Sequence, residues 1–189
     1  ISLPSCTSIG PQSQFEATFD SSLTSILMPL LATGSVYIHF NRKLETLSLP
    51  VLSSGSNGVN LSNLTSISLP LLTTAENFVV NSNPVLTSIN LSAMAALGNE
   101  FGTHTVYNNP LLTTITWPNL ASIRANLTYL FGSNRLPSSE VNNILAKIVA
   151  VHPVSCNITL NQTVAAPPTG QGITDKATLI SWGNTVTTD

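Results

Sequence analysis

Apolar residues return along the chain in one short pattern, written most clearly as LTSISLPLLTT at 64–74. The pattern starts again at Leu23, Leu44, Leu86 and Leu112, so its spacings are 21, 20, 22 and 26 residues. A period in the twenties is typical of leucine-rich repeats and related solenoids, whose coils stack and share one core. The sequence therefore predicts a repeat array.

Each repeat predicts a short strand at its leucine. In LTSISLPLL, the side chains of Leu64, Ile67, Leu69 and Leu72 are expected to point inward, and Ile67 and Leu69 have the period of 2 of a strand. Pro70 ends the strand because it has no N–H to donate to a ladder. The outward positions form two columns, Ser25, Thr46, Ser66, Ser88 and Thr114, and Leu27, Ser48, Ser68, Asn90 and Thr116.

A second strand is predicted before each Asn-rich turn, in VYIHFN (36–41), FVVNSN (78–83) and HTVYNN (104–109). Repeat 44–63 is about three residues short at this point, and repeat 112–135 is irregular. Two strands in every coil predict a right-handed leucine-rich-repeat solenoid with two parallel β-sheets and about six coils. The inward positions of the second strand include Val36, Ile38, Phe78 and Val80.

Asparagines mark one corner of the predicted coil. Asn41, Asn83 and Asn109 each lie three residues before the leucine of the next repeat. Stacked at a corner, their side chains are expected to bond to backbone groups that a buried bend otherwise leaves unpaired.

The end of the chain has a different pattern. SSEVNNILAKIVAV has a helical apolar stripe, with Ser138 as the expected N-cap. TDKATLISWG predicts a second short helix, capped by Thr174 and ended by Gly183, and SCNITLN and TVTT predict strands. We therefore assign 1–135 to the array and 136–189 to a C-terminal α/β cap over its open edge. The array itself is expected to be N-terminally incomplete, since ISLPSCTSI aligns with ISLPLLTTA within a repeat.

Composition narrows the choice of partners. Only 7% of the 189 residues are charged, against roughly 25% in an average soluble chain, and the net charge is −2. The six Lys and Arg residues are scattered, which argues against nucleic acid or an anionic membrane surface as partner. No apolar run approaches the roughly 18 residues of a membrane span. Cys6 and Cys156 are expected to lie near opposite ends of the array and to remain unpaired.

Two segments carry a resemblance to a known family. NPVLTSINL and NPLLTTITWPNL are similar to the leucine-rich repeats of bacterial surface proteins and to receptor L-domain solenoids. The ending AAPPTGQGITDKATLISWGNTVTTD resembles the closing segment of secreted or surface repeat proteins of Bacteroidetes-type bacteria and of their phages. The resemblance implies a recognition or adhesion module at a cell surface, and it transfers no site residues.

Catalytic and metal-binding patterns are not found in the sequence. His39, His104 and His152 have no second ligand at metal-binding spacing, and no HExxH, CxxC, GxSxG or phosphate-binding loop occurs. The eight acidic residues are dispersed, so no glycosidase pair is indicated. We therefore expect no cofactor, no metal and no enzyme activity. His104 is expected to be a hydrogen-bonded core histidine, and Trp117 to fill the inward position of Leu69.

The outward face of the second strand is the candidate binding surface. One column holds Tyr37, Val79 and Thr105, and its neighbour holds His39, Asn81 and Tyr107. Aromatic rings beside amide and imidazole groups suit a protein or carbohydrate contact.

The leading interpretation is a non-catalytic extracellular recognition or adhesion module that binds a protein or glycan through this face. The alternative is a structural or receptor-binding part of a phage particle or surface assembly, joined through the N-terminal edge. Ice binding on the hydroxyl columns and a glycan-active enzyme are the minor alternatives.

Overall fold

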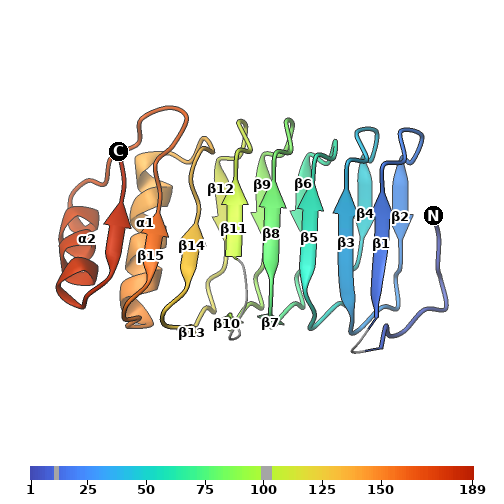
Figure 1. The fold of residues 1–189 in the computed structure, drawn as a ribbon, viewed down its shortest axis with the longest axis horizontal. Coiled ribbons are helices and arrows are strands. Elements are labelled where there is room, and N and C mark those ends of the chain that lie inside the picture. Colours follow the sequence, from blue (N-terminus) through green and yellow to red (C-terminus); the bar gives the residue numbers. More distant parts are fainter. Residues whose placement is uncertain (11–12, 99–103) are drawn as a thin grey trace.

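The computed structural model describes residues 1–10, 13–98 and 104–189, which form an elongated parallel β-solenoid with its two termini at opposite ends (Figure 1). The solenoid makes about five turns, one fewer than expected. The first repeat contributes only isolated bridges, at Ser2 and Ser8, before its first full strand. The predicted parallel solenoid with helices at its C-terminal end is confirmed.

The largest face of the solenoid is one eight-stranded parallel sheet (Figure 1). It contains the predicted second strand of every coil, including the coil of repeat 44–63, which aligns without a gap between its neighbours. The strands in spatial order are β1 (Gln14–Thr18), β3 (Ser35–His39), β5 (Asn57–Asn60), β8 (Phe78–Asn81), β11 (His104–Tyr107), β14 (Thr128–Leu130), β15 (Asn157–Thr159) and β16 (Thr185–Thr187).

The leucine strands form a second face, in the register that the two hydroxyl columns require. Their hydrogen bonding is interrupted once, so the face consists of a two-stranded and a three-stranded sheet. The two-stranded sheet is β2 (Ser25–Leu27) with β4 (Thr46–Ser48), and the three-stranded sheet is β6 (Ser66–Ser68), β9 (Ser88–Asn90) and β12 (Thr114–Thr116).

The solenoid has a third face with a parallel sheet of its own, which the sequence did not predict. The expectation of two parallel sheets is therefore wrong. Between the leucine strand and the large sheet, the chain forms a further short parallel segment with its own inward residue, such as Ala75 or Leu97. Isolated bridges from Ser8 through Thr33 and Ser54 to Thr74 continue this segment toward the N-terminus. Its strands are β7 (Thr74–Ala75), β10 (Ala96–Leu97) and β13 (Ser122–Ile123).

The interior is a continuous stack of aliphatic side chains. Every inward position predicted for the two main strands is buried, and Ile26, Ile38, Leu64 and Leu72 are 0–1% exposed. Trp117 replaces a leucine in this stack and meets Phe131 edge-to-face at a ring-centroid distance of 5.2 Å. A void under the middle coils measures only about 10 Å³. Because the interior is filled, it leaves no room for a ligand.

One buried row of side chains ties the coils together at the corner after the large sheet. The Asn83 Nδ2 group donates to the Val59 carbonyl at 3.0 Å, and the Asn83 Oδ1 atom accepts from the N–H and hydroxyl groups of Ser62 at 3.0 and 2.7 Å. Asn109 donates likewise to the Val80 carbonyl at 2.9 Å. The structure thus places Asn41, Asn83 and Asn109 in one row, with Ser62 in the coil of repeat 44–63 and Asn134 after Asn109.

The cap continues the solenoid and adds two helices, α1 (Ser138–Ala150) and α2 (Gln171–Ser181) (Figure 1). Strands β15 and β16 extend the large sheet beyond residue 135. Helix α1 buries its predicted stripe and also protects the outer edge of β12, where the Glu140 carboxylate accepts the Ile115 N–H at 3.1 Å. An edge strand covered in this way cannot pair with another chain.

Both expected helix caps are wrong. Pro137 holds the N-cap position of α1, and no side chain caps that helix. Helix α2 begins at Gln171, directly after Gly170, whose φ of +51° turns the chain into the helix, so Thr174 lies inside it. Gly183, with φ +83°, lies just beyond the end of α2, as expected.

Candidate functional site

The outer face of the large sheet brings the predicted binding residues into two adjoining rows. Pairing of β3, β5, β8 and β11 aligns Tyr37 with Val79 and Thr105, and His39 with Asn81 and Tyr107. The rows also contain two residues that sequence reasoning missed, Gly58 and Asn60. They were missed because repeat 44–63 was taken as three residues short.

The rings of Tyr37 and His39 lie close together at one end of the two rows. A Cβ atom on Gly58 would lie 2.8 Å from Cδ1 of Tyr37, so the tyrosine ring leans over the glycine. The Tyr37 and His39 rings are nearly parallel, with centroids 6.0 Å apart and planes 12° apart. The absence of a side chain at Gly58 therefore creates the place that Tyr37 occupies.

Side-chain amides fix the second row. Asn60 Nδ2 lies 2.9 Å from Nδ1 of His39, and Asn60 Oδ1 accepts the Asn81 N–H at 3.0 Å. Asn81 Oδ1 in turn accepts the Tyr107 N–H at 3.2 Å. Since each amide bridges to a neighbouring coil, the row is held in one conformation before any ligand arrives.

Tyr107 stands apart from the other two rings. It is 39% exposed and lies three strands from Tyr37, which corresponds to about 14 Å at the usual strand spacing. The structure therefore brings Tyr37 and His39 together and leaves Tyr107 as a second, separate contact point on the same face.

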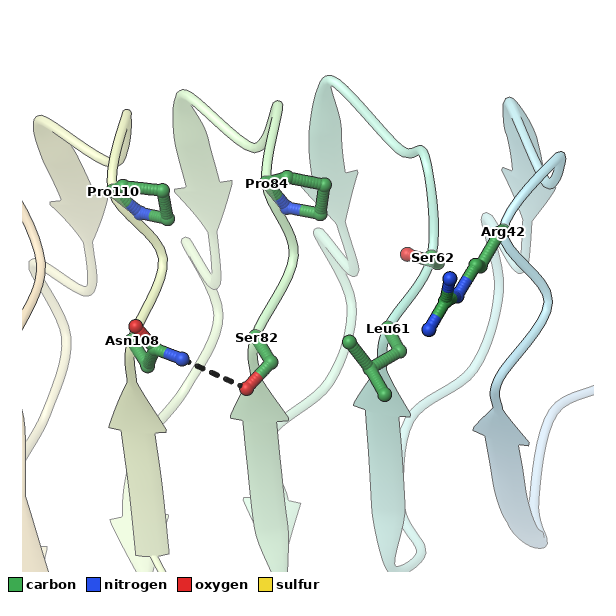
Figure 2. Close-up of a pocket in the computed structure, with 7 residues that line it drawn as sticks. All are labelled: Arg42, Leu61, Ser62, Ser82, Pro84, Asn108 and Pro110. Carbon is green, nitrogen blue, oxygen red and sulfur yellow. Dashed lines mark hydrogen bonds between the residues drawn. The ribbon is translucent and has the colours of Figure 1, made fainter.

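A groove lies where the chain leaves this sheet, above β5, β8 and β11 (Figure 2). Its volume is about 400 Å³. The Asn108 amide donates to the Ser82 hydroxyl at 3.1 Å across the groove (Figure 2). The lining residues are Arg42, Leu61, Ser62, Ser82, Pro84, Asn108 and Pro110.

A row of left-handed backbone residues runs along this corner, one position before the buried Asn row. We name it the corner row, and it is defined by successive backbone bonds such as Phe40 N–H to the Asn60 carbonyl. Sequence reasoning missed it, because backbone conformation at a turn is not readable from the apolar pattern. Its members, with φ between +51° and +59°, are Phe19, Phe40, Leu61, Ser82, Asn108 and Ser133.

His104 departs from its expected state. It is buried at the inward register, against Tyr129 at a ring-centroid distance of 5.5 Å. Neither ring nitrogen has a hydrogen-bond partner among the residues that the structure describes, so the expectation of a hydrogen-bonded histidine is wrong. Burial lowers the pKa of His104 to about 4, which keeps the ring neutral at physiological pH.

The remaining reactive groups are isolated. Cys6 and Cys156 are both free, and burial raises the pKa of the Cys156 thiol. Within residues 1–10, 13–98 and 104–189, no three His, Cys, Asp or Glu residues come together as a metal would require. None of the helices in these same ranges has the length and apolarity needed to span a bilayer.

Comparisons with known proteins return no match, whether with family models, with curated proteins or with solved structures. Function is therefore inferred from the chain's own surfaces.

Proposed function

We propose that this chain is a non-catalytic extracellular recognition or adhesion module of the leucine-rich-repeat type, with right-handed coils. It binds a protein or a glycan through the outer face of the eight-stranded sheet. The observation that carries the proposal is the pair of outward rows that contain Tyr37, His39 and Tyr107 on one sheet.

The physical support is preorganisation. The rows lie on consecutive hydrogen-bonded strands, and amide bridges between coils fix His39, Asn60 and Asn81. A ligand that binds such a surface loses little free energy to ordering the protein. Tyrosine rings add a large contact area and a hydroxyl at small entropic cost, which suits both protein and carbohydrate surfaces.

Charge has a small part in this mode of binding. The chain carries six basic and eight acidic residues, and its outer sheet rows contain only Glu16 on β1 among acidic residues. We expect affinity through this face to change little between low and physiological salt, because screening acts mainly on charged pairs.

The test of this face is a substitution series. Tyr107→Ala should reduce retention of the protein on a glycan array or on a displayed peptide library, and leave its melting curve unchanged because the ring is exposed. Thr116→Ala, an exposed change on the leucine-strand face, is the matched control and should retain full binding. Equal retention of Tyr107→Ala and the unsubstituted chain would dismiss the face.

A second candidate is a structural or receptor-binding part of a phage particle or surface assembly. It is favoured by the stacked pair of Phe19 and Phe40, which are 72% and 41% exposed. An assembly would cover these rings. Light scattering distinguishes the two: a fixed oligomer at micromolar concentration supports the assembly, and a monomer supports the free module.

A further inference from the structure

The corner row carries bulky apolar residues where the fold does not need them. Left-handed backbone disfavours side chains other than those of Gly, Asn and Asp. Three later coils place Ser82, Asn108 and Ser133 at this position, so a small polar residue is sufficient for the turn. Phe19 and Phe40 therefore stand in a strained position that the turn alone does not explain.

These two phenylalanines are also exposed. Phe19 is 72% and Phe40 is 41% exposed, and their rings stack with centroids 4.4 Å apart and planes 4° apart. Each ring covers a face of the other, so the pair does not offer a flat platform on which a sugar ring could stack. We name the pair Phe19 and Phe40 the ridge. Strained backbone positions cluster at functional sites, and contiguous exposed apolar side chains mark interaction sites.

The ridge leads directly into the groove. Leu61 is the next member of the corner row after Phe40, and it also lines the groove. The rings of Pro84 and Pro110 lie on neighbouring coils and line the upper side of the groove (Figure 2). Together these side chains form one apolar surface over several coils.

A single positive charge lies at the same place. The Arg42 guanidinium projects toward Leu61 and Ser62 (Figure 2). No acidic residue lines the groove. A carboxylate is the complementary group, because the guanidinium fork matches its two oxygens.

Two polar groups of the groove are engaged within the protein, and Arg42 is its charged donor. The Ser62 hydroxyl donates to Asn83 at 2.7 Å, and the Asn108 amide donates to the Ser82 hydroxyl at 3.1 Å. A saccharide needs several free donors and acceptors for its hydroxyl groups, whereas an apolar side chain needs none. The groove volume of about 400 Å³ is sufficient for one large side chain and its flanking backbone.

We infer that the ridge and groove bind a protein segment that presents an apolar side chain beside a carboxylate. The apolar side chain lies between Leu61 and the two prolines, the carboxylate pairs with Arg42, and the flanking segment packs on Phe40 and Phe19. The inference rests on the proposed recognition function and names a partner class for this edge of the sheet.

Three small probes test the groove by amide chemical shifts of the labelled protein: N-acetyl-L-tryptophan, its uncharged amide N-acetyl-L-tryptophanamide, and methyl glucuronide. N-acetyl-L-tryptophan should shift the amides of Ser62, Ser82 and Asn108 saturably, and the uncharged analogue should bind about fivefold more weakly. Arg42→Gln should remove this difference, and Arg135→Gln, an exposed arginine outside the groove, should preserve it. Equal affinity of the two tryptophan probes, no saturable shift, or tighter binding of methyl glucuronide overturns the inference.

A random peptide library displayed against the protein tests the ridge. Selected peptides should carry an aromatic or aliphatic residue next to Asp or Glu, and Phe40→Asn should lose them, since asparagine suits the turn while removing the ring. Selected peptides that bind Phe40→Asn equally well, or that carry basic residues, contradict the inference. If retention depends on Tyr107 and not on Arg42 or Phe40, the groove is wrong while the proposed function stands.

Discussion

Asn83 offers the sharpest test of how the coils are held together. Asn83→Ala removes a side chain that is fully buried and that bonds to Ser62 and Val59 of the preceding coil and to Asn109 of the following coil. The substitution removes the hydrogen bonds that the Ser62 N–H and the Val59 carbonyl make with Asn83, in a buried place, and the Ser62 hydroxyl loses its acceptor as well.

The cost follows from the two backbone groups. A buried polar group that loses its partner destabilises the fold by about 1–3 kcal/mol, so the pair gives about 4 kcal/mol. Asn83→Asp should cost more, because its second oxygen would face the carbonyls of Val59 and Asn81 where the amide now donates. Asn143→Ala is the control: the side chain of this exposed residue on α1 donates to Glu140, and we expect a change within about 0.5 kcal/mol.

Urea unfolding followed by circular dichroism measures the effect, with the slope of the free energy against urea compared between variants. The expected order of stability is the unsubstituted chain equal to Asn143→Ala, then Asn83→Ala, then Asn83→Asp. An Asn83→Ala variant within about 1 kcal/mol of the unsubstituted chain, or an Asp variant as stable as the Ala variant, would show that the buried row does not hold the coils together in this way.

Two further predictions concern the interior. Ile67→Asp should prevent folding, because it places an unpaired charge among stacked aliphatic side chains, and a melting transition like that of the unsubstituted chain would contradict the inward register of β6. The second prediction concerns the pH dependence of folding stability. Because the His104 pKa falls from its ordinary 6.5 to about 4 on folding, the unfolded chain binds the proton first, so stability is lost as pH falls from 6.5 to about 4. The loss is about 3 kcal/mol, and His104→Leu should flatten this limb of the pH profile; an unchanged profile in that variant counts against a neutral buried ring.

Much of the fold was predictable because each repeat places apolar residues at the same positions. The inward positions around Ile67 and Val36 and the apolar stripe of α1 follow from periodicity alone. The predicted binding residues also fall in the expected rows, since a parallel sheet aligns equivalent positions of successive coils.

The features that the sequence did not predict depend on backbone geometry. The third face has strands of only two residues, such as β7, which are too short for a period to appear. Gly58 and Asn60 were missed because the residue types of this coil differ from those of its neighbours, not its spacing: Asn57 takes an inward position that is apolar in the adjacent strands, and Ser62 takes the place of the corner Asn. The left-handed conformation of Phe40 and the missing partners of His104 arise from packing between coils, which no single repeat encodes.

Methyl–methyl nuclear Overhauser contacts test the stacked interior most directly. The inward row of the large sheet contains Ile38, Val59, Val80 and Val106, each aligned with the next by strand pairing. We expect a contact between every neighbouring pair in that row, although successive members are 21, 21 and 26 residues apart. A spectrum in which these methyl groups contact only residues of their own repeat would contradict the stacking of consecutive coils around one shared core.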